Sequence, residues 1–244
     1  MGTRSAIVLA AGLGMRMRPI TDTIPKPLVE VEGKPLIAYS LEALENLGIE
    51  TIVVNIHYLP ETLIDWLERR NGGRILISDE RNELLDSGGA VVHALPLLGG
   101  EPLMLLNADT FWIEDPAAAR SNLAVLDAAF DPERMDILLL TARLTQATGH
   151  TGAGDFVADA ANRLHRFTGT GVPLIYAGAL VLHPRIFAGI SERKFSLNRC
   201  FDAAIAAGRL YGQPLYGHWL TVGTPQAIGE AELAMQAYRQ GSTP

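Results

Sequence analysis

Three basic residues follow a glycine-containing turn near the start of the chain. The apolar residues 6–9 predict a strand, and the segment 10–14, which reads Ala-Ala-Gly-Leu-Gly, comes directly after it. A turn of small residues leaves backbone N–H groups without partners, and such donors suit the oxygens of a phosphate. Arg16, Arg18 and Lys26 add positive charge immediately downstream. The spacing therefore predicts a polyphosphate-binding loop, although it matches neither common nucleotide pattern, G-x-x-x-x-G-K-[ST] or G-x-G-x-x-G.

An acidic residue follows a second apolar run. Residues 102–106 are continuously apolar, which is typical of a strand covered on both faces, and Asn107-Ala108-Asp109 come next. Because ligands of parallel sheets bind beyond the carboxyl ends of the strands, we expect Asp109 to lie beside the glycine turn. A carboxylate in this place could hold Mg²⁺ against a triphosphate. The alternative is a loop residue that caps a turn.

The composition limits the class of protein. The chain has 244 residues, a formal net charge of -7 and a pI near 5.4, which argue against broad attachment to nucleic acid or to an anionic membrane surface. Cys200 is alone in the sequence, so an intramolecular disulfide is excluded. The sequence has no uninterrupted apolar stretch of about twenty residues and no secretory signal before the first strand. We therefore expect one compact cytoplasmic domain.

Alternating patterns of apolar residues predict the elements that position these side chains. Further strands are expected at residues 51–55, 74–78, 136–141 and 174–184, and helices at 34–48, 60–70, 88–98, 114–131, 195–208 and 225–239. Pro96 is expected to break the helix at 88–98, and Asp115-Pro116 to start the helix at 114–131. The alternation predicts an α/β fold, a Rossmann-like three-layer sandwich with a mostly parallel central sheet.

The second half of the chain contains turn residues and short strand-like pieces. Residues 146–154 are rich in Gly and Thr and are expected to be mobile, and residues 154–167 predict hairpins added to the sheet. Gly178 interrupts an apolar strand, which indicates a bulge or a close approach to the backbone. We expect these pieces to form a small β region that acts as a lid or wall.

The complete pattern around the turn, Gly12-x-Gly14-x-Arg16-x-x-Pro19-x-Thr21 followed by Pro25-Lys26-Pro27-Leu28, resembles the signature of the sugar-1-phosphate nucleotidyltransferases. The resemblance implies the nucleotide-diphospho-sugar transferase fold, and a reaction of an NTP with a sugar 1-phosphate that needs Mg²⁺. It implies that Arg16 and Lys26 hold phosphates and that Asp109 carries the metal. The nucleotide-binding residues that it implies around the turn are Leu9, Ala11, Gly12, Gly14, Met15 and Arg16.

A second motif bears on the nucleobase. Leu85-Asp86-Ser87-Gly88-Gly89 resembles the Leu-Glu-Thr-Gly-Gly of bacterial N-acetylmuramate-1-phosphate uridylyltransferases, which act in cell-wall recycling. The resemblance makes Leu85, Ser87 and Gly88 candidates for contacting the base, and it implies UTP and N-acetylmuramate 1-phosphate as substrates. An ordinary loop with a helix cap is the local alternative. Mannose- or heptose-1-phosphate guanylyltransferases are the nearest alternative families.

The sugar side of the site is implied by three further segments. Gly154-Asp155-Phe156 and Tyr176-Ala177-Gly178 resemble family elements that lie beside the bound sugar, and Asn107 belongs to the element at the metal. The sugar-binding candidates are Asn107, Asp155, Ala177 and Gly178; a turn carboxylate is the alternative for Asp155. We expect a single domain over residues 1–244, with a nucleotide-binding half at about 1–145 and a sugar-binding half at 146–244.

Thr221 departs from the family pattern. The family usually has Trp-x-Asp before Gly-Thr-Pro, with that Asp as a second carboxylate on the metal, and this chain has Trp219-Leu220-Thr221. The change could weaken the metal site, could be offset by His218 or water, or could abolish turnover and leave a nucleotide-sugar sensor. Because Mg²⁺ often keeps several waters and phosphate ligands, one carboxylate can suffice. No pattern in the sequence sets the oligomeric state.

Overall fold

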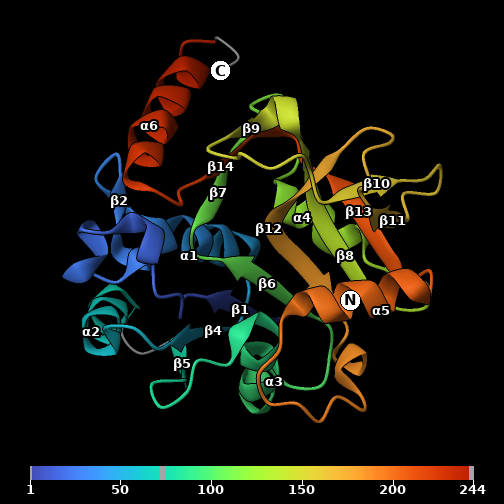
Figure 1. The fold of residues 1–244 in the computed structure, drawn as a ribbon, viewed down its shortest axis with the longest axis horizontal. Coiled ribbons are helices and arrows are strands. Elements are labelled where there is room, and N and C mark those ends of the chain that lie inside the picture. Colours follow the sequence, from blue (N-terminus) through green and yellow to red (C-terminus); the bar gives the residue numbers. More distant parts are fainter. Residues whose placement is uncertain (1, 72–74, 242–244) are drawn as a thin grey trace.

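The central sheet of the computed structural model is mostly parallel, as predicted (Figure 1). The structure describes residues 2–71 and 75–241, and within them this sheet has nine strands. The strands that share one direction are β1 (Ser5–Leu9), β4 (Thr51–Ile56), β5 (Ile75–Asp79), β6 (Leu103–Asn107), β8 (Ile137–Arg143), β10 (Phe156–Ala158) and β13 (Leu210–Pro214). β11 (Leu164–Arg166) and β12 (Leu174–Leu182) run the opposite way. Arg74, expected to open a strand, lies outside the described residues.

The register of three parallel strands brings their carboxyl ends level. β1 lies between β4 and β6, and Leu9 pairs with Asn55 on one side and with Asn107 on the other. The glycine turn after β1 therefore begins between the ends of two neighbouring strands. The ligand edge expected for a parallel sheet is built from these three ends.

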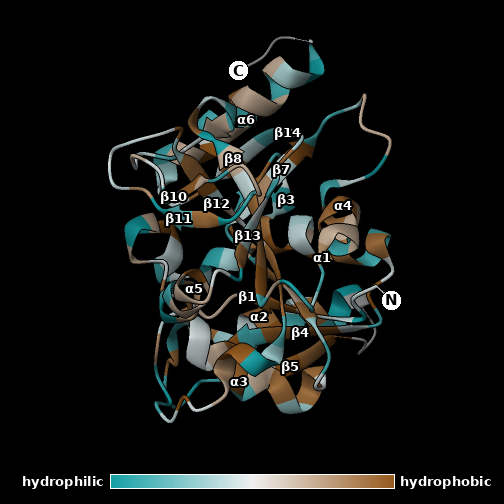
Figure 2. Ribbon diagram, turned by 90° about the vertical axis from the view of Figure 1, so that its right-hand side faces the viewer, coloured by the Kyte–Doolittle hydropathy of each residue, from teal (hydrophilic) through white to brown (hydrophobic). Residues whose placement is uncertain are grey.

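Helices cover both faces of the sheet, which confirms the three layers. On one face, α1 (Leu36–Leu47), α2 (Pro60–Asn71) and α4 (Asn122–Ala129) share an apolar cluster with the β1 residues Ala6 and Val8. On the other face, α3 (Asp86–Leu98) and α5 (Leu197–Ala206) share a cluster that contains Ile7. Figure 2 shows the hydrophobic strands between these helices. No helix in the described part of the chain is long and apolar enough to cross a membrane.

A small second sheet follows the end of β6, and the helix predicted at 114–131 begins later than expected. β7 (Thr110–Glu114), β14 (Gly217–Thr221) and β9 (Ala147–Thr148) form it in the order β7-β14-β9. The predicted helix start at 114 is wrong, because the helix begins at Asn122, where the Ser121 hydroxyl accepts a hydrogen bond from the Ala124 N–H. Asp115 instead forms a turn by accepting from the Ala117 N–H. The segment 146–154, expected to be mobile, contributes β9.

One predicted helix break is absent, and one further helix completes the fold. α3 runs through Pro96 to Leu98, so the predicted break is wrong. Pro96 lacks an N–H for the helix, but it lies in the last turn, where little helix remains to be disrupted. α6 (Pro225–Arg239) projects beside the C-terminus in Figure 1 and packs Ala227, Ala231 and Ala234 into a third apolar cluster with β7 and β14.

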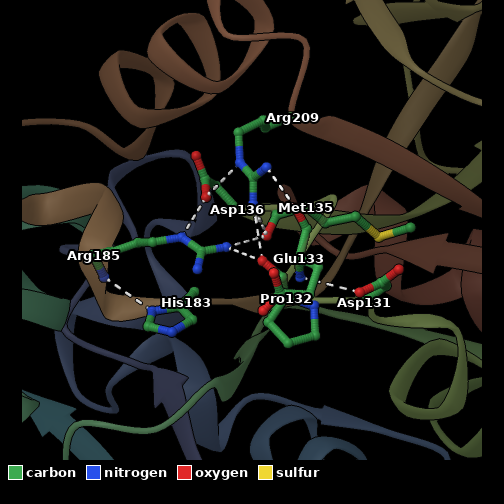
Figure 3. A network of polar contacts seen from close by, with 8 residues as sticks. All are labelled: Asp131, Pro132, Glu133, Met135, Asp136, His183, Arg185 and Arg209. Carbon is green, nitrogen blue, oxygen red and sulfur yellow. Dashed lines mark hydrogen bonds and ion pairs between the residues drawn. The ribbon is translucent and has the colours of Figure 1, made fainter.

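A buried ionic network fixes the end of the sheet that is opposite to the glycine turn (Figure 3). Asp136, whose side chain is 12% exposed, accepts hydrogen bonds from Arg185 Nε at 2.6 Å and Arg209 Nε at 2.9 Å. The same guanidinium groups also donate to backbone carbonyls of the 132–135 loop. His183 accepts from the Arg185 N–H and so has a structural contact, as expected. The network ties the starts of β8 and β13 to the end of β12.

Replacing Asp136 with Asn should make the free energy of unfolding less dependent on pH in the acidic range. Burial raises the pKa of the Asp136 carboxyl, but the hydrogen bonds from Arg185 and Arg209 outweigh it and hold the pKa below its ordinary value of 3.8. The carboxylate therefore stabilises the fold fully above pH 4, and this contribution disappears as the pH falls through the lowered pKa. Urea unfolding at pH 7 should show that Asp136→Asn lowers the free energy of unfolding by about 1.5–3 kcal/mol.

The difference in free energy of unfolding between Asp136→Asn and the wild type should become smaller when urea unfolding is measured below pH 4. Asp22→Asn is a suitable control, because Asp22 forms an ion pair with Arg18 whose side chains are 52% and 50% exposed. Such a pair adds little stability. An equal loss for Asp136→Asn at pH 7 and below pH 4 would contradict the assignment.

Candidate active site

The glycine turn packs directly against the segment that carries Lys26. Gly14 has φ +62°, and a Cβ atom there would lie 2.9 Å from Thr21 Cγ2 and 3.1 Å from Lys26 Cβ. The Thr21 hydroxyl donates to the Gly14 carbonyl at 2.8 Å. Only glycine meets both the backbone and the steric requirement here. The spacing of Gly14, Thr21 and Lys26 thus has a packing reason.

A pocket of about 380 Å³ lies at the carboxyl ends of β1, β4 and β6. The sequence-predicted residues that line it are Leu9, Ala11, Gly12, Lys26, Ser87, Asn107 and Asp109. The catalytic and nucleotide-binding candidates that do not line it are Gly14, Met15, Arg16, Leu85 and Gly88. The structure therefore brings the glycine turn, the segment 85–89 and the end of β6 to one cavity.

An ion pair forms the charged part of this pocket. Lys26 Nζ lies 2.6 Å from Asp109 Oδ2, and the two side chains are 12% and 38% exposed. The pair joins the segment after the glycine turn to the end of β6. A phosphate could therefore meet an ammonium group here, and a cation could meet a carboxylate.

A second pocket, of about 200 Å³, adjoins the first and shares Leu9, Ser87 and Asn107 with it. Asp155 lines this pocket and accepts a hydrogen bond from the Tyr176 N–H at 2.9 Å. Tyr176 also lines it, and its hydroxyl is buried with no hydrogen-bond partner among the described residues. Burial, followed by the Asp109 charge, raises the pKa of Tyr176 far above its usual range. Tyr176 therefore keeps its proton at neutral pH.

Two joined pockets with an ion pair between strand ends suit two phosphorylated substrates, and the comparisons specify the family. The sequence pattern of the family described as "Nucleotidyl transferase" matches residues 5–168. The chain belongs to this family. It is 44% identical to the N-acetylmuramate alpha-1-phosphate uridylyltransferase of Caulobacter vibrioides, over 94% of this chain and 96% of that protein.

Further comparisons agree with membership of the nucleotidyl transferase family. The chain is 35% identical to the N-acetylmuramate alpha-1-phosphate uridylyltransferase of Neisseria meningitidis, over 96% of this chain and 99% of that protein. The fold is shared with the inositol-1-phosphate CTP transferase from T. maritima, with a TM-score of 0.77 at 18% identity over 100% of this chain and 99% of the other. The nucleotidyl transferase fold expected from the sequence is confirmed.

The paired glycines of this nucleotidyl transferase accommodate a neighbouring loop. The N–H groups of Gly88 and Gly89 both donate to the Phe195 carbonyl, at 2.9 and 3.1 Å. A Cβ atom would lie 2.3 Å from the Phe195 ring at Gly88, and 2.3 Å from the Arg193 carbonyl oxygen at Gly89. The docked loop places Lys194 on the wall of the larger pocket. Contact of Gly88 with a base stays a prediction, since its N–H already has a protein acceptor.

Thr221, at the position expected to hold a second metal ligand, lies on a strand end that is hydrogen-bonded to the Asp109 segment. Thr221 pairs with Thr110, and the Val222 N–H donates to the Asp109 carbonyl at 3.0 Å. Gly223 lies beside the Arg16 guanidinium, since a Cβ atom there would be 3.4 Å from Arg16 Nη2. Thr221 and Arg16 thus approach the Asp109 edge from β14 and from the glycine turn.

His218 does not replace the missing carboxylate. It pairs with Ile113, three positions along β14 from Thr221, and its Nε2 lies 2.8 Å from the Thr148 hydroxyl. An odd spacing along a strand also places His218 and Thr221 on opposite faces. Burial lowers the pKa of His218, as expected for a neutral, enclosed imidazole. The described residues contain no group of three or more His, Cys, Asp or Glu that could hold a metal.

A hydrogen-bonded chain joins two walls of the larger pocket, and the sequence interpretation missed it. Asn55 Oδ1 accepts from the Ala10 N–H at 2.7 Å, and Asn55 Nδ2 donates to Glu80 Oε1 at 2.7 Å. Glu80 Oε2 then accepts from the Leu85 N–H at 3.0 Å. The available signal was positional, because Asn55 lies at the end of β4 and Glu80 follows β5. These hydrogen bonds fix the position of the glycine turn relative to the segment 85–89.

Ala177 and Gly178 position their neighbours and line neither pocket. Gly178 has φ +77°, and the register of β12 with β8 shifts between Tyr176 and Leu180, so the expected bulge is present. Trp219 Nε1 donates to the Ala177 carbonyl at 2.8 Å. This bulge holds Tyr176 at the wall of the smaller pocket.

Proposed function

We propose that the protein transfers the uridylyl group of UTP to N-acetylmuramate 1-phosphate, with UDP-N-acetylmuramate and pyrophosphate as products. The observation that carries the proposal is the pair of joined pockets, which share Asn107 and have the Lys26–Asp109 pair in the larger one. The choice of substrates follows the names of the two relatives. In this proposal residues 1–145 bind UTP and residues 146–244 bind the sugar, in the cytoplasm during cell-wall recycling.

The chemistry needs positioning and charge neutralisation. A phosphate oxygen of the sugar 1-phosphate attacks the α-phosphorus of UTP, and the bond to the β-phosphate oxygen breaks, so that pyrophosphate leaves with the electron pair. The attacking oxygen is already anionic at neutral pH, so no protein base is required. Lys26 contacts the reacting phosphates, and Arg16 stabilises the departing pyrophosphate. Leu9, Ala11, Gly12, Gly14 and Met15 shape the phosphate-binding turn.

The donor set fits Mg²⁺ with few protein ligands. Asp109 offers a partly exposed carboxylate at the strand edge, and Thr221 offers a hydroxyl on the adjoining strand end. Mg²⁺ is commonly held by one or two carboxylates, with waters and substrate phosphates completing its shell. When bound, the ion would neutralise triphosphate charge, while Lys26 would turn from Asp109 toward a phosphate.

Pyrophosphate release tests the proposal. Purified protein with Mg²⁺ is assayed with UTP, GTP, CTP and dTTP, each against N-acetylmuramate 1-phosphate, mannose 1-phosphate and glucose 1-phosphate. UTP with N-acetylmuramate 1-phosphate should give the highest kcat/KM. Another best pair would overturn the substrates, and nucleotide binding without pyrophosphate release from any pair would favour a sensor.

Replacing Thr221 with Asp should lower the Mg²⁺ concentration that gives half-maximal turnover. The added carboxylate would stand beside Asp109 and attract the cation, an effect of about 10-fold if the two charges share the ion. Thr221→Val is the matched comparison, since it removes the hydroxyl without adding charge. A Mg²⁺ titration unchanged by Thr221→Asp would exclude Thr221 from the metal site.

Replacing Glu80 with Gln should raise the KM for UTP. The new amide N–H must face either Asn55 Nδ2 or the Leu85 N–H, and turning the Asn55 amide only moves the conflict to the Ala10 N–H. One buried donor stays unpaired in every arrangement, which costs about 1–3 kcal/mol and loosens both pocket walls. Steady-state kinetics and urea unfolding measure the two effects.

Glu83→Gln is the control for Glu80→Gln, because Glu83 is on the same loop with its side chain 46% exposed, 3.5 Å from Arg193. Its KM for UTP should stay close to that of the wild type. Equal KM values for both variants would show that Glu80 has no role in holding the nucleotide pocket.

A further inference from the structure

The smaller pocket is lined by a positively charged side chain to which the proposed reaction assigns no role. Among the described residues that line it, Arg166 is the basic one, at the end of β11. The proposed phosphate contacts, Lys26 and Arg16, lie outside this pocket. Arg166 therefore faces the part of the site assigned to the sugar.

Arg166 is held in a fixed orientation. Its Nε donates to Asp202 Oδ1 at 2.8 Å, and its Nη2 donates to Asn198 Oδ1 at 2.9 Å. The guanidinium carbon lies 4.9 Å from the centre of the Phe156 ring and 6.0 Å from that of Phe201. Hydrogen bonds in the plane and aromatic rings beside it leave little rotational freedom. A fixed guanidinium is suited to recognising a ligand at low entropic cost.

The unpaired N–H donors of Arg166 are suited to an anionic hydrogen-bond acceptor. Its Nη1 group has no hydrogen-bond partner among the described residues, so both of its N–H donors are available. Asp202 is 63% exposed, so water weakens its neutralisation of the guanidinium. Asp155 shares the pocket but accepts the Tyr176 N–H. A carboxylate would form stronger hydrogen bonds with Nη1 than a neutral sugar hydroxyl would.

This inference rests on the proposed function. N-acetylmuramate is N-acetylglucosamine with a lactyl ether at the sugar C3 hydroxyl, and the lactyl group adds one carboxylate. We infer that Arg166 binds this carboxylate and thereby selects the acidic sugar phosphate over its neutral parent. Tyr176 also lines this pocket.

Paired substrates test the inference. N-acetylmuramate 1-phosphate and N-acetylglucosamine 1-phosphate are compared with UTP in wild type, Arg166→Met and Arg166→Lys, and direct calorimetric binding of both sugar phosphates is measured. The ratio of kcat/KM for acidic over neutral sugar should fall by about 10- to 100-fold in Arg166→Met, mainly through KM for the acidic one. Arg166→Lys should recover part of the preference, because it keeps the charge but loses the planar donor fork.

Arg163→Met is the matched control, because Arg163 precedes the same strand but pairs with Asp159 outside the pocket. It should keep the wild-type preference. An unchanged preference in Arg166→Met, or equal losses for both sugars, would overturn the role of Arg166. Failure of the wild type to turn over any sugar phosphate would instead contradict the proposed function, and calorimetric preference for the acidic sugar would still decide the inference.

Discussion

Lys26→Ala should lower kcat/KM by about 100-fold or more while the protein stays folded. Lys26 is 12% exposed in the larger pocket, and its Nζ lies 2.6 Å from Asp109. An ammonium group in this place neutralises charge that builds up as the α-phosphorus is attacked. A water molecule that fills the vacated space carries no charge and cannot replace it. Pyrophosphate release and thermal unfolding measure activity and stability separately.

Arg18→Ala is the matched control for Lys26→Ala. Arg18 is in the same segment but forms an exposed ion pair with Asp22 and lies outside the pocket lining. It should keep activity within a few fold of the wild type, since an exposed pair contributes little. Near-normal turnover in Lys26→Ala, or equal losses in both variants, would remove Lys26 from the reaction.

Gly178→Ala should destabilise the fold by about 2–5 kcal/mol and impair sugar binding. The left-handed backbone at φ +77° disfavours any side chain, and the new Cβ would lie 2.0 Å from Thr110 Oγ1. The clash would separate β12 from the start of β7 and displace Tyr176, two positions away. Urea unfolding measures the loss of stability, and KM for the sugar phosphate measures the displacement.

Gly33→Ala is the control that separates the cost of the left-handed backbone from the cost of the steric clash. Gly33 has φ +72° in a turn, but a Cβ atom there would meet nothing within 4 Å. Its cost should be that of the backbone alone, about 1–2 kcal/mol. A Gly178→Ala loss no greater than this would show that the contact with Thr110 relaxes at no cost.

Local patterns predicted the glycine turn well because its parts are close in sequence. Gly14, Thr21 and Lys26 contact one another within thirteen positions, and the strand before them is marked by its own apolar run. Asp109 could also be placed, since the carboxyl ends of parallel strands share one edge. Its ion pair with Lys26 was not predicted, because Lys26 follows the turn instead of ending a strand and reaches Asp109 only in the fold.

Long-range pairings explain what the sequence did not show. β7 was not predicted; it pairs with β14, about a hundred positions away, and no local pattern connects the two segments. Likewise, the glycines at 88 and 89 are required by the loop at 193–195, which no local pattern connects to them. Arg166 became a site candidate only when β11 was placed beside α5. Asn55 and Glu80 could have been found, since both are polar residues at strand ends.

The most direct test of the two-pocket assignment is a crystal structure with bound UDP-N-acetylmuramate. The uracil should lie in the larger pocket beside Ser87, the diphosphate beside Lys26, and the sugar in the smaller pocket against Asp155, with its carboxylate at Arg166. A sugar bound away from Asp155 and Tyr176, or a base outside the pocket that contains Ser87, would contradict the assignment.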